Sequence, residues 1–360
     1  QPPDKGFVQP PSFRLAIMSA GGKEAGEDDE ELPGTTFRGG RWEIAARTAD
    51  AATFRKTDPA LGLEVLKEYT LVRVDGEERN DVDFPAHKAY HMTLDITVRN
   101  TGAESQKIVY RLDGPNGLPT EGFWYAYRIG REWGSAGLRD VVARPEGRAS
   151  MQFSASELAE EGQKSMTEKN ALGYVGVDAQ YFASILLPEK PLTAEWFDER
   201  WALRLGPEPN PKKTRLTFTD VTCRLQRKPV DLEAGGELRD SYVVFCGPKR
   251  PKLLAKYEAG DDPNYNLGDL VYYGWPIWGV VARVMSGILH WFYHLVGNYG
   301  ISILLLTVVV RLCMFPLSRK QALNMAKMQE LKPEMDKINE KYKKDLEKRT
   351  KAQQELWRQH

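Results

Sequence analysis

Apolar and polar residues alternate along most of the first 246 residues of this chain. Seven segments show a period of two with many β-branched and aromatic residues, as half-buried strands do. These segments are 36–47, 63–74, 90–100, 107–114, 149–155, 214–225 and 240–246. Clusters of Gly, Asn, Asp and Ser separate several of them, and residues 154–163 carry the clearest helical period. So many short strands in one domain predict a large antiparallel β-sandwich or a barrel.

A helix with two distinct faces is predicted over residues 275–297. Its apolar side chains recur at steps of three and four, at Trp278, Val281, Met285, Ile288, Phe292 and Leu295. A narrow polar stripe that includes Arg283 lies on the opposite side, and aromatic residues gather at both ends, as at bilayer interfaces. The helix either spans the membrane or lies flat in its interface, and the polar stripe favours the flat orientation.

The most lipid-compatible stretch follows, and we expect a transmembrane helix over residues 298–317. One full charge, Arg311, lies inside it, with Thr307 one turn away on the same face. A charge in hydrocarbon is costly unless it has water or a partner, so Arg311 is a candidate functional residue. Two interpretations stay open. The side chain bends toward the membrane surface, or it faces a wet cavity inside a helix bundle.

A further amphipathic helix is predicted over residues 318–360. Pro316 should bend or stop the membrane helix, and Ser318 with Gln321 has the spacing of a capping box. The thin apolar stripe of the new helix includes Met325, Met328 and Leu331. Such a stripe is typical of one arm of a helical hairpin, and methionines suit adaptable contacts with varied partners.

Charge is balanced in total, with 50 basic and 50 acidic residues, but it is unevenly distributed. Residues 318–360 hold 12 Lys and Arg against 7 Asp and Glu, whereas residues 1–270 hold 36 against 43. The positive-inside rule places the basic end in the cytoplasm and the acidic part outside, so the β-domain is exported. This distribution is not that of a nucleic-acid-binding protein.

Composition also marks the domain boundaries. Residues 1–34 are proline-rich and acidic and are expected to be flexible, apart from one strand, while the β-domain occupies 35–250. A linker with one short helix is expected over 251–274. Because the exported domain has no visible export signal and a lone helix with Arg311 has nothing to pack against, we expect further membrane helices on both sides of this sequence.

Catalytic and metal chemistry are not indicated, and no cofactor is expected. His87 and His91 would share one face if the run that holds them is a strand, but no third ligand is evident nearby. His290 and His294 lie one turn apart but lack the Glu of a HExxH protease. No phosphate-binding glycine loop follows any predicted strand.

The cysteines and aromatic residues leave two alternatives open. Cys223 and Cys246 fall in predicted strands of the exported domain, where a disulfide is feasible but spacing alone does not decide it. Cys313 lies in the membrane segment, where packing is the simplest role. Four aromatic residues either line a sugar cleft or pack in a core: Trp124, Tyr125, Tyr127 and Trp133.

Three stretches near the end of the chain resemble the YidC family of membrane protein insertases. They are GNYGISI, TVVVRLCMFPLSRKQ and MAKMQELKP. Residues 113–125 and 173–188 are similar to that family's periplasmic domain. The resemblance implies a large β-sandwich like that of sugar mutarotases. It also implies that residues 275–297 are an interfacial helix on the outer face and that residues 318–360 are the first arm of a cytoplasmic hairpin.

The resemblance further implies a function that needs no enzymatic chemistry. In that family the matching arginine is the positive charge of a hydrophilic groove, which assigns Arg311, with Thr307 beside it, to the groove. The protein would insert and help assemble nascent integral membrane proteins in the bacterial inner membrane, alone or with the Sec translocon. The translating ribosome and membrane lipid are further expected partners.

The alternative reading is a membrane-tethered periplasmic protein that binds carbohydrate or acts as a mutarotase. A tether needs neither an internal arginine nor an amphipathic arm on the far side of the membrane. No pair of acidic residues at telling spacing stands out in the β-domain, and a shared fold does not imply a shared activity. A third reading, a docking scaffold in an export complex, overlaps with the insertase.

Overall fold

The computed structural model describes residues 9–73, 88–119, 138–145, 148–166, 171–188, 196–209, 216–257, 267–271, 276–341, 350–351 and 354. The chain forms two compact units, Gln1–Gly274 and Trp275–His360. His87 and the four aromatic residues considered for a sugar cleft lie outside the described residues.

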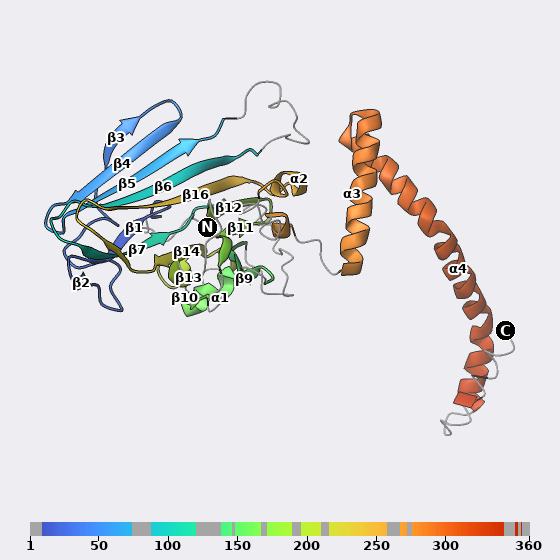
Figure 1. The fold of residues 1–360 in the computed structure, drawn as a ribbon. Coiled ribbons are helices and arrows are strands. Elements are labelled where there is room, and N and C mark those ends of the chain that lie inside the picture. The colour runs from blue at the N-terminus through green and yellow to red at the C-terminus, as the bar shows by residue number, and fades with distance from the viewer. Residues whose placement is uncertain are drawn as a thin grey trace. The chain divides into compact units, whose positions relative to one another are not determined.

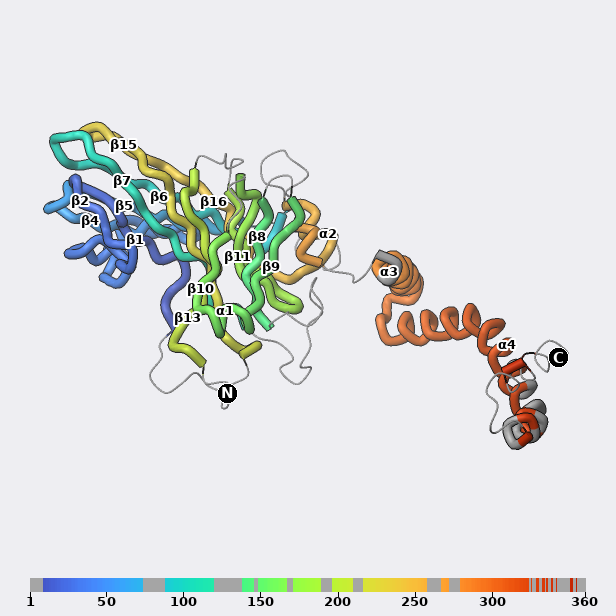
Figure 2. Tube along the Cα trace, turned by 90° about the horizontal axis from the view of Figure 1, so that it is seen from below, coloured from blue at the N-terminus to red at the C-terminus, as the bar shows by residue number. Residues whose placement is uncertain are grey.

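The first unit contains two antiparallel sheets. The seven-stranded sheet has the order β10-β13-β14-β7-β1-β2, with β15 paired to β7 (Figure 2). Its strands are β1 Leu15–Ala20, β2 Lys23–Glu24, β7 Gln106–Asp113, β10 Gln163–Ser165, β13 Phe197–Leu205, β14 Asp220–Arg227 and β15 Val230–Leu232.

The nine-stranded sheet has the order β3-β4-β5-β6-β16-β12-β11-β8-β9, and its long strands are seen in Figure 1. Its strands are β3 Glu43–Arg47, β4 Ala51–Asp58, β5 Leu63–Leu71, β6 His91–Asn100, β8 Arg139–Pro145, β9 Met151–Phe153, β11 Leu172–Ala179, β12 Phe182–Pro188 and β16 Glu237–Pro248. All strand pairs are antiparallel. The predicted all-β sandwich is therefore confirmed.

One apolar core lies between the two sheets. Tyr110 and Val221 reach it from the seven-stranded sheet, while Val65, Val98 and Val244 reach it from the nine-stranded sheet. Alternate residues of each strand face this core, because successive side chains of a strand point to opposite faces. The period of two in the sequence therefore located most of the core-facing positions.

The N-terminal segment contributes more to this core than its composition indicates. Every residue of β1 is buried, and β1 pairs with both β2 and β7. Leu32, which follows the acidic run, is also buried, and its amide donates to the Ile17 carbonyl at 2.7 Å. The one strand expected within residues 1–34 is β1, and the structure adds that this strand and Leu32 are buried in the core.

Short helices complete the first unit. The predicted helix over residues 154–163 is α1 Ala155–Glu161, whose N-terminal amide at Ser156 donates to the Ser154 hydroxyl at 3.2 Å. A single turn, η2 Leu216–Phe218, precedes β14.

Two described parts of the segment expected to be a linker, residues 251–257 and 267–271, pack on the outer face of the nine-stranded sheet. Leu253 and Leu254 of α2 Pro251–Leu254, with Leu267 and Leu270 of η4 Leu267–Leu270, are buried against side chains of β8, β11, β12 and β16. Figure 1 shows α2 beside β11 and β12. Four leucines in two short turns bury apolar area without any period that a sequence window detects.

The second unit consists of α3 Pro276–Val296 and α4 Tyr299–Lys341. Tyr299–Leu323 is the one candidate membrane span in the part of the chain that the structure describes, and its 25 residues are almost entirely unburied. It is longer than the expected span of 298–317.

Helix α4 does not stop at Pro316, so the new helix expected from Ser318 onward is wrong. Pro316 and Pro333 both lie inside α4. A proline removes one backbone donor and strains the preceding turn, but flanking turns rich in Leu, Met, Lys and Glu continue the helix. Figures 1 and 2 show that the axis of α4 curves along its length.

Candidate functional site

The turn between α3 and α4 is built from local backbone contacts. Gly297 ends α3 with φ +66°, a conformation that glycine adopts without strain, and its amide donates to the Tyr293 carbonyl at 2.7 Å. The Asn298 side chain then accepts from the Gly300 and Ile301 amides at 2.8 and 3.3 Å. Asn298 therefore caps the start of α4, because it satisfies donors that have no partner within the helix.

Aromatic rings reinforce this turn. The Tyr293 and Tyr299 rings stack with centroids 3.9 Å apart and planes 18° apart. The His290 ring lies edge-on to Tyr299 at 6.5 Å. Ser302 is fully buried, and its hydroxyl donates to the Asn298 carbonyl at 2.8 Å. These contacts define which side of α4 faces α3.

The opposite side of α4 carries Arg311. The less exposed residues of the span share the Ser302 side, at Leu305, Leu306, Val309 and Val310. Arg311 follows Ser302 by nine residues, which is two and a half turns at 3.6 residues per turn. Arg311 and Thr307 therefore point away from the α3 contact, on one face of α4 as predicted.

Thr307 and Arg311 do not form a hydrogen bond with each other. The Thr307 hydroxyl donates to the Ile303 carbonyl of its own helix at 2.8 Å. Arg311 is exposed, and none of the described residues forms an ion pair or hydrogen bond with it.

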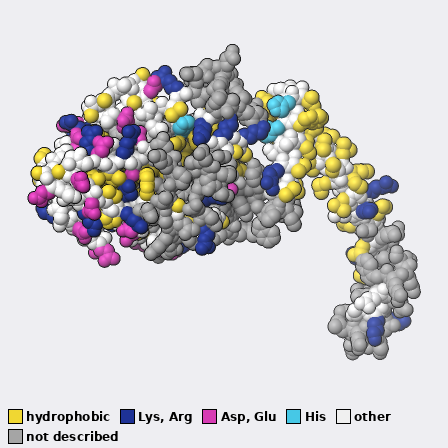
Figure 3. Space-filling view, in the orientation of Figure 1, with side chains coloured by type: hydrophobic (Ala, Val, Ile, Leu, Met, Phe, Trp, Pro, Cys, Tyr) yellow, Lys and Arg dark blue, Asp and Glu magenta, His cyan; other side chains and the backbone are white. Residues whose placement is uncertain are grey.

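The two helices expose a large apolar surface. Figure 3 shows apolar side chains gathered over α3 and the first part of α4. Leu304 and Leu312 are each 67% exposed, and Val284 and Trp291 on α3 are also exposed. Phe292 is half-buried beside the Trp291 ring, with centroids 5.1 Å apart. Water does not favour so much exposed apolar surface, whereas lipid does.

The remaining predicted positions fall on the same two helices. The Arg283 Nε donates to the Gly279 carbonyl at 3.3 Å, within its own helix. Met325 and Met328 are exposed on α4. The side chains of Trp278 and Leu331 lie outside the described residues.

The cysteines and His91 of the β-domain take structural positions. Cys223 and Cys246 are free and lie in different sheets, on β14 and β16. Burial raises the pKa of the Cys223 thiol to about 12. His91 Nδ1 lies 2.8 Å from the Tyr257 hydroxyl, and burial lowers the pKa of the imidazole. No group of three potential metal ligands occurs within the described ranges.

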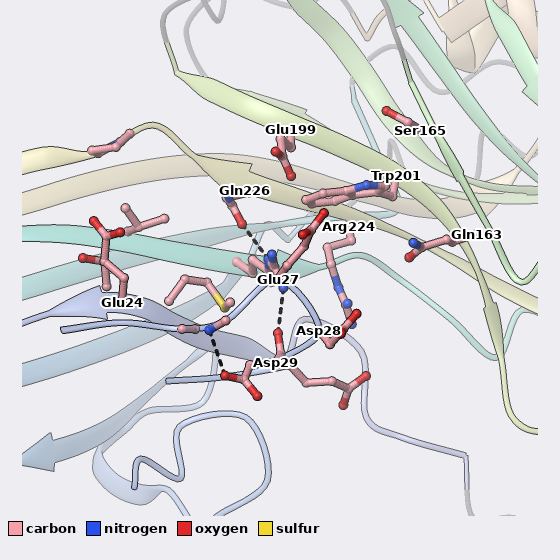
Figure 4. Close-up of a pocket in the computed structure, with 18 residues that line it drawn as sticks. Glu24, Glu27, Asp28, Asp29, Gln163, Ser165, Glu199, Trp201, Arg224 and Gln226 are labelled. Carbon is pink, nitrogen blue, oxygen red and sulfur yellow. Dashed lines mark hydrogen bonds between the residues drawn. The ribbon is translucent and has the colours of Figure 1, made fainter. Parts of the chain in front are cut away.

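A polar cavity of about 730 Å³ lies on the outer face of the seven-stranded sheet and was missed by sequence reasoning. Figure 4 shows Glu27 and Asp28 of the acidic run lying toward Trp201 on β13 and Arg224 on β14. The Asp29 carboxylate instead accepts from the Gly26 amide at 2.8 Å. The sequence contained an acidic run but no sign of its partners, because the basic residues come from strands far apart in the chain.

Comparison with known proteins identifies both units. Residues 44–286 match the family model of the YidC periplasmic domain, and residues 291–360 match that of the 60Kd inner membrane protein. Two relatives from Anaeromyxobacter dehalogenans strains, both named Membrane protein insertase YidC, are 29% and 30% identical over 278 residues. Each match covers 76% of this chain and 44% of the relative, so the chain spans less than half the relatives' length.

Solved structures resemble the β-domain more distantly. A galactose mutarotase-like protein from Lactobacillus casei ATCC 334 is 11% identical, with 68% of this chain and 87% of that chain covered. The TM-score is 0.40.

Proposed function

This chain belongs to the YidC family of membrane protein insertases, and on that premise we propose that it inserts and helps assemble integral membrane proteins through a hydrophilic groove at Arg311. The observation that carries the proposal is the position of Arg311. It lies midway along the apolar span Tyr299–Leu323, on the face of α4 turned away from α3, and without an ion-pair partner among the described residues.

The mechanism requires no covalent step. A wet groove part-way into the membrane shortens the dehydrated path that a polar tail must cross. Arg311 attracts acidic residues in that tail, because opposite charges interact more strongly where the dielectric is low. The tail passes outward while the apolar segment partitions into lipid, which is favourable for apolar surface.

The depth of Arg311 favours a groove over bending toward the surface. Arg319 and Lys320 provide the next charges and would lie at the cytoplasmic interface. Arg311 precedes Arg319 by eight residues, or about 12 Å at 1.5 Å per residue. A groove predicts that a substrate chain reaches the Arg311 face of α4, whereas a side chain that bends toward the surface does not.

The flanking elements would control access to the groove. We assign α3, with Trp278, Arg283 and Phe292, to the outer interface, since it combines apolar side chains with a narrow polar stripe. The part of α4 beyond Pro316 would be the cytoplasmic arm.

The apolar side chains of this arm would contact substrate near the groove mouth. They are Met325, Met328 and Leu331.

This topology defines the compartments and the partners. Residues 1–297 would be periplasmic and residues 318–360 cytoplasmic, in a multi-pass protein of the bacterial inner membrane. Nascent integral membrane proteins are the proposed substrates. The Sec translocon, the translating ribosome and membrane lipid are the proposed partners, since substrates reach the groove during synthesis.

Site-specific crosslinking to a ribosome-stalled nascent membrane protein tests the proposal. A photoreactive residue at position 307, with Arg311 retained, should crosslink to the nascent chain, and the same residue at position 305 on the α3 side should not. Neutralising the acidic residues of the nascent tail should weaken the crosslink. Labelling of lipid alone from position 307 would contradict the groove.

A charge substitution provides the second test. R311Q should lower insertion of a substrate with an acidic tail by about tenfold, equivalent to about 1.4 kcal/mol. R311K retains the charge and should retain most of the activity, and a substrate with a neutral tail should be affected much less. Equal losses for both substrates would contradict a role for charge attraction.

A further inference from the structure

Two adjoining cavities hollow the outer face of the seven-stranded sheet. Their volumes are about 730 and 530 Å³, and both are lined by Glu30, Gln163 and Arg224. Trp201 lines the larger cavity and Arg38 the smaller one. Because they share lining residues, the two cavities adjoin in one depression, which is larger than a single small ion needs.

A cluster of arginines forms the floor of this depression. Asp113 is buried at its centre. Its carboxylate accepts from Arg224 Nε at 2.7 Å and from an Nη atom of Arg38 at 3.2 Å, and it forms an ion pair with Arg14 at 3.1 Å. Burial opposes ionisation of Asp113, but the three guanidinium groups outweigh it and lower the pKa of the carboxyl.

The cluster carries more positive charge than Asp113 compensates. Burial and the nearby Arg38 charge lower the pKa of Arg14. Arg38 is only 9% exposed, yet its Nε and that of Arg14 have no hydrogen-bond acceptor among the described residues. Buried guanidinium donors that lack an acceptor are costly, so this floor favours an additional anion.

The protein's own acidic run supplies part of that anion. Glu30 forms an ion pair with Arg38, and Arg111 donates to the Asp29 carbonyl at 3.0 Å. The Glu30 side chain is nevertheless 70% exposed. Figure 4 shows neighbouring acidic side chains of the run over the larger cavity.

The run is attached at its two ends. The Ala25 amide donates to the Met18 carbonyl at 2.8 Å, and the Leu32 amide donates to the Ile17 carbonyl at 2.7 Å. Residues 26–31 between these contacts pair with no strand. The run contacts the arginines through the exposed Glu30 side chain, through the Asp29 carbonyl, and through Glu31 Oε1, which accepts from the Arg38 amide at 3.0 Å. Another carboxylate-bearing segment has the chemistry to replace Glu30.

We propose that the depression around Arg14, Arg38 and Arg224 is a binding site for acidic polypeptide segments, and that residues 26–31 occupy it in the absence of such a partner. Guanidinium groups bind carboxylates through paired, charge-assisted hydrogen bonds. A carboxylate borne on a polypeptide already contacts Arg38, which is why a peptide is favoured over a free ion. This site is separate from Arg311 and does not depend on the proposed insertase function.

Binding of a fluorescein-labelled hexaglutamate peptide to the full chain in nanodiscs tests the proposal by fluorescence anisotropy. The peptide should bind in a salt-dependent manner, while hexaglutamine and hexalysine should not. E30Q removes the internal competitor and should tighten binding about threefold or more. R14Q should weaken binding about tenfold, or about 1.4 kcal/mol.

Matched controls make the result decisive. R99Q removes an exposed arginine from the other sheet and should leave the affinity unchanged. Inorganic phosphate at the peptide's concentration should not displace it, and full displacement would assign the site to small anions instead. If R14Q fails to fold, the tighter peptide binding expected of E30Q carries the test. Unchanged affinity in E30Q, or equal losses in R14Q and R99Q, would overturn the proposal.

Discussion

The β-domain and the membrane unit differ in whether their charged side chains have ion-pair partners. In the β-domain, the buried carboxylates of Asp113 and Asp178 have cationic partners within the fold, which are Arg224 and, at 2.8 Å, Lys249. In the membrane unit, Arg311 has no such partner among the described residues, and apolar side chains such as Leu312 are exposed. The first unit pairs these charges within its own fold, whereas the second exposes apolar surface that lipid favours.

The contact between the two sheets illustrates the first case. Asp240 on β16 is buried in the core and forms an ion pair with Arg227 on β14 at 2.7 Å. The Tyr110 hydroxyl on β7 also donates to Asp240. Burial raises the pKa of Asp240, and the Arg227 charge only partly counters this effect. The network joins both sheets, so each partner depends on the other.

The largest expected effect comes from breaking this pair. R227M should lower the free energy of unfolding of the β-domain by about 3–5 kcal/mol, because it leaves the Asp240 carboxyl buried without its cation. R239M is the matched control, since Arg239 is 62% exposed in its pair with Asp95 and should cost less than about 1 kcal/mol. Chemical unfolding followed by near-ultraviolet circular dichroism measures both. Equal losses would contradict the comparison.

Removing Arg311 from the membrane unit should be favourable, whereas removing Arg227 from the β-domain is unfavourable. R311L should favour membrane integration of the span Tyr299–Leu323 by about 3 kcal/mol, because a central arginine is costly and leucine is favourable there. The measurement is the inserted fraction of a reporter that carries this span with a glycosylation site on each side. R319L, at the end of the span, should change integration much less. No gain from R311L would show that the span inserts without exposing Arg311 to lipid.

Lys67 is a buried cation of the β-domain whose ammonium group contacts an aromatic ring and a backbone carbonyl. Its Nζ is buried 4.1 Å from the Trp42 ring centroid and donates to the Phe13 carbonyl at 3.2 Å. Burial, with the nearby Lys56 charge, lowers the pKa of Lys67 to about 8. Between pH 8 and the unfolded value near 10.5, the unfolded chain binds the proton and the folded chain does not. Stability should therefore rise with pH through this window.

K67M removes this pH dependence. At pH 7 the variant should be more stable than the parent by about 1–3 kcal/mol, because the lowered pKa means that burying the ammonium ion costs free energy. The difference should shrink toward pH 10, where the parent no longer buries an ammonium ion. Thermal unfolding at both pH values provides the measurement. A parent protein whose stability falls through this pH range relative to K67M would contradict the assignment.

The smallest expected effect concerns the bend that we attribute to Pro316. P316A restores a backbone donor to the carbonyl of Leu312 and should straighten α4 locally. Spin labels at positions 308 and 325, about 25 Å apart by helix rise, should move apart by roughly 1–3 Å. P333A lies outside the labelled stretch and should leave this distance unchanged. An unchanged distance in P316A would assign the curvature of α4 to another cause.

Much of the fold followed from local pattern. Strands β5, β6, β7 and β16 were predicted because each alternates apolar and polar residues over a half-buried surface. Helix α3 was predicted because its apolar positions recur at the helical period. Strand β13 was not predicted, although it pairs with β14 along most of its length. Its exposed Asp198 and Glu199 obscure the alternation.

The two candidate sites, Arg311 and the arginine cluster of the β-domain, also differ in whether local pattern reveals them. Arg311 is recognisable within its own segment, because a charge inside an apolar run stands out without any knowledge of neighbours. The arginine cluster is not, because Arg14, Arg38 and Arg224 are separated by long stretches of chain and meet only where β1 and β14 flank β7. In the sequence, each of these arginines by itself looks like an ordinary surface charge.

The sequence by itself determined the strand-rich domain, the amphipathic α3, the apolar span and the central position of Arg311, since each depends on the period or composition of one continuous segment. Only the tertiary structure decided that β1 is buried, that the segment after β16 covers a sheet, and that the acidic run lies over an arginine cluster. Those features depend on strand order and on contacts between distant residues, which local pattern does not encode.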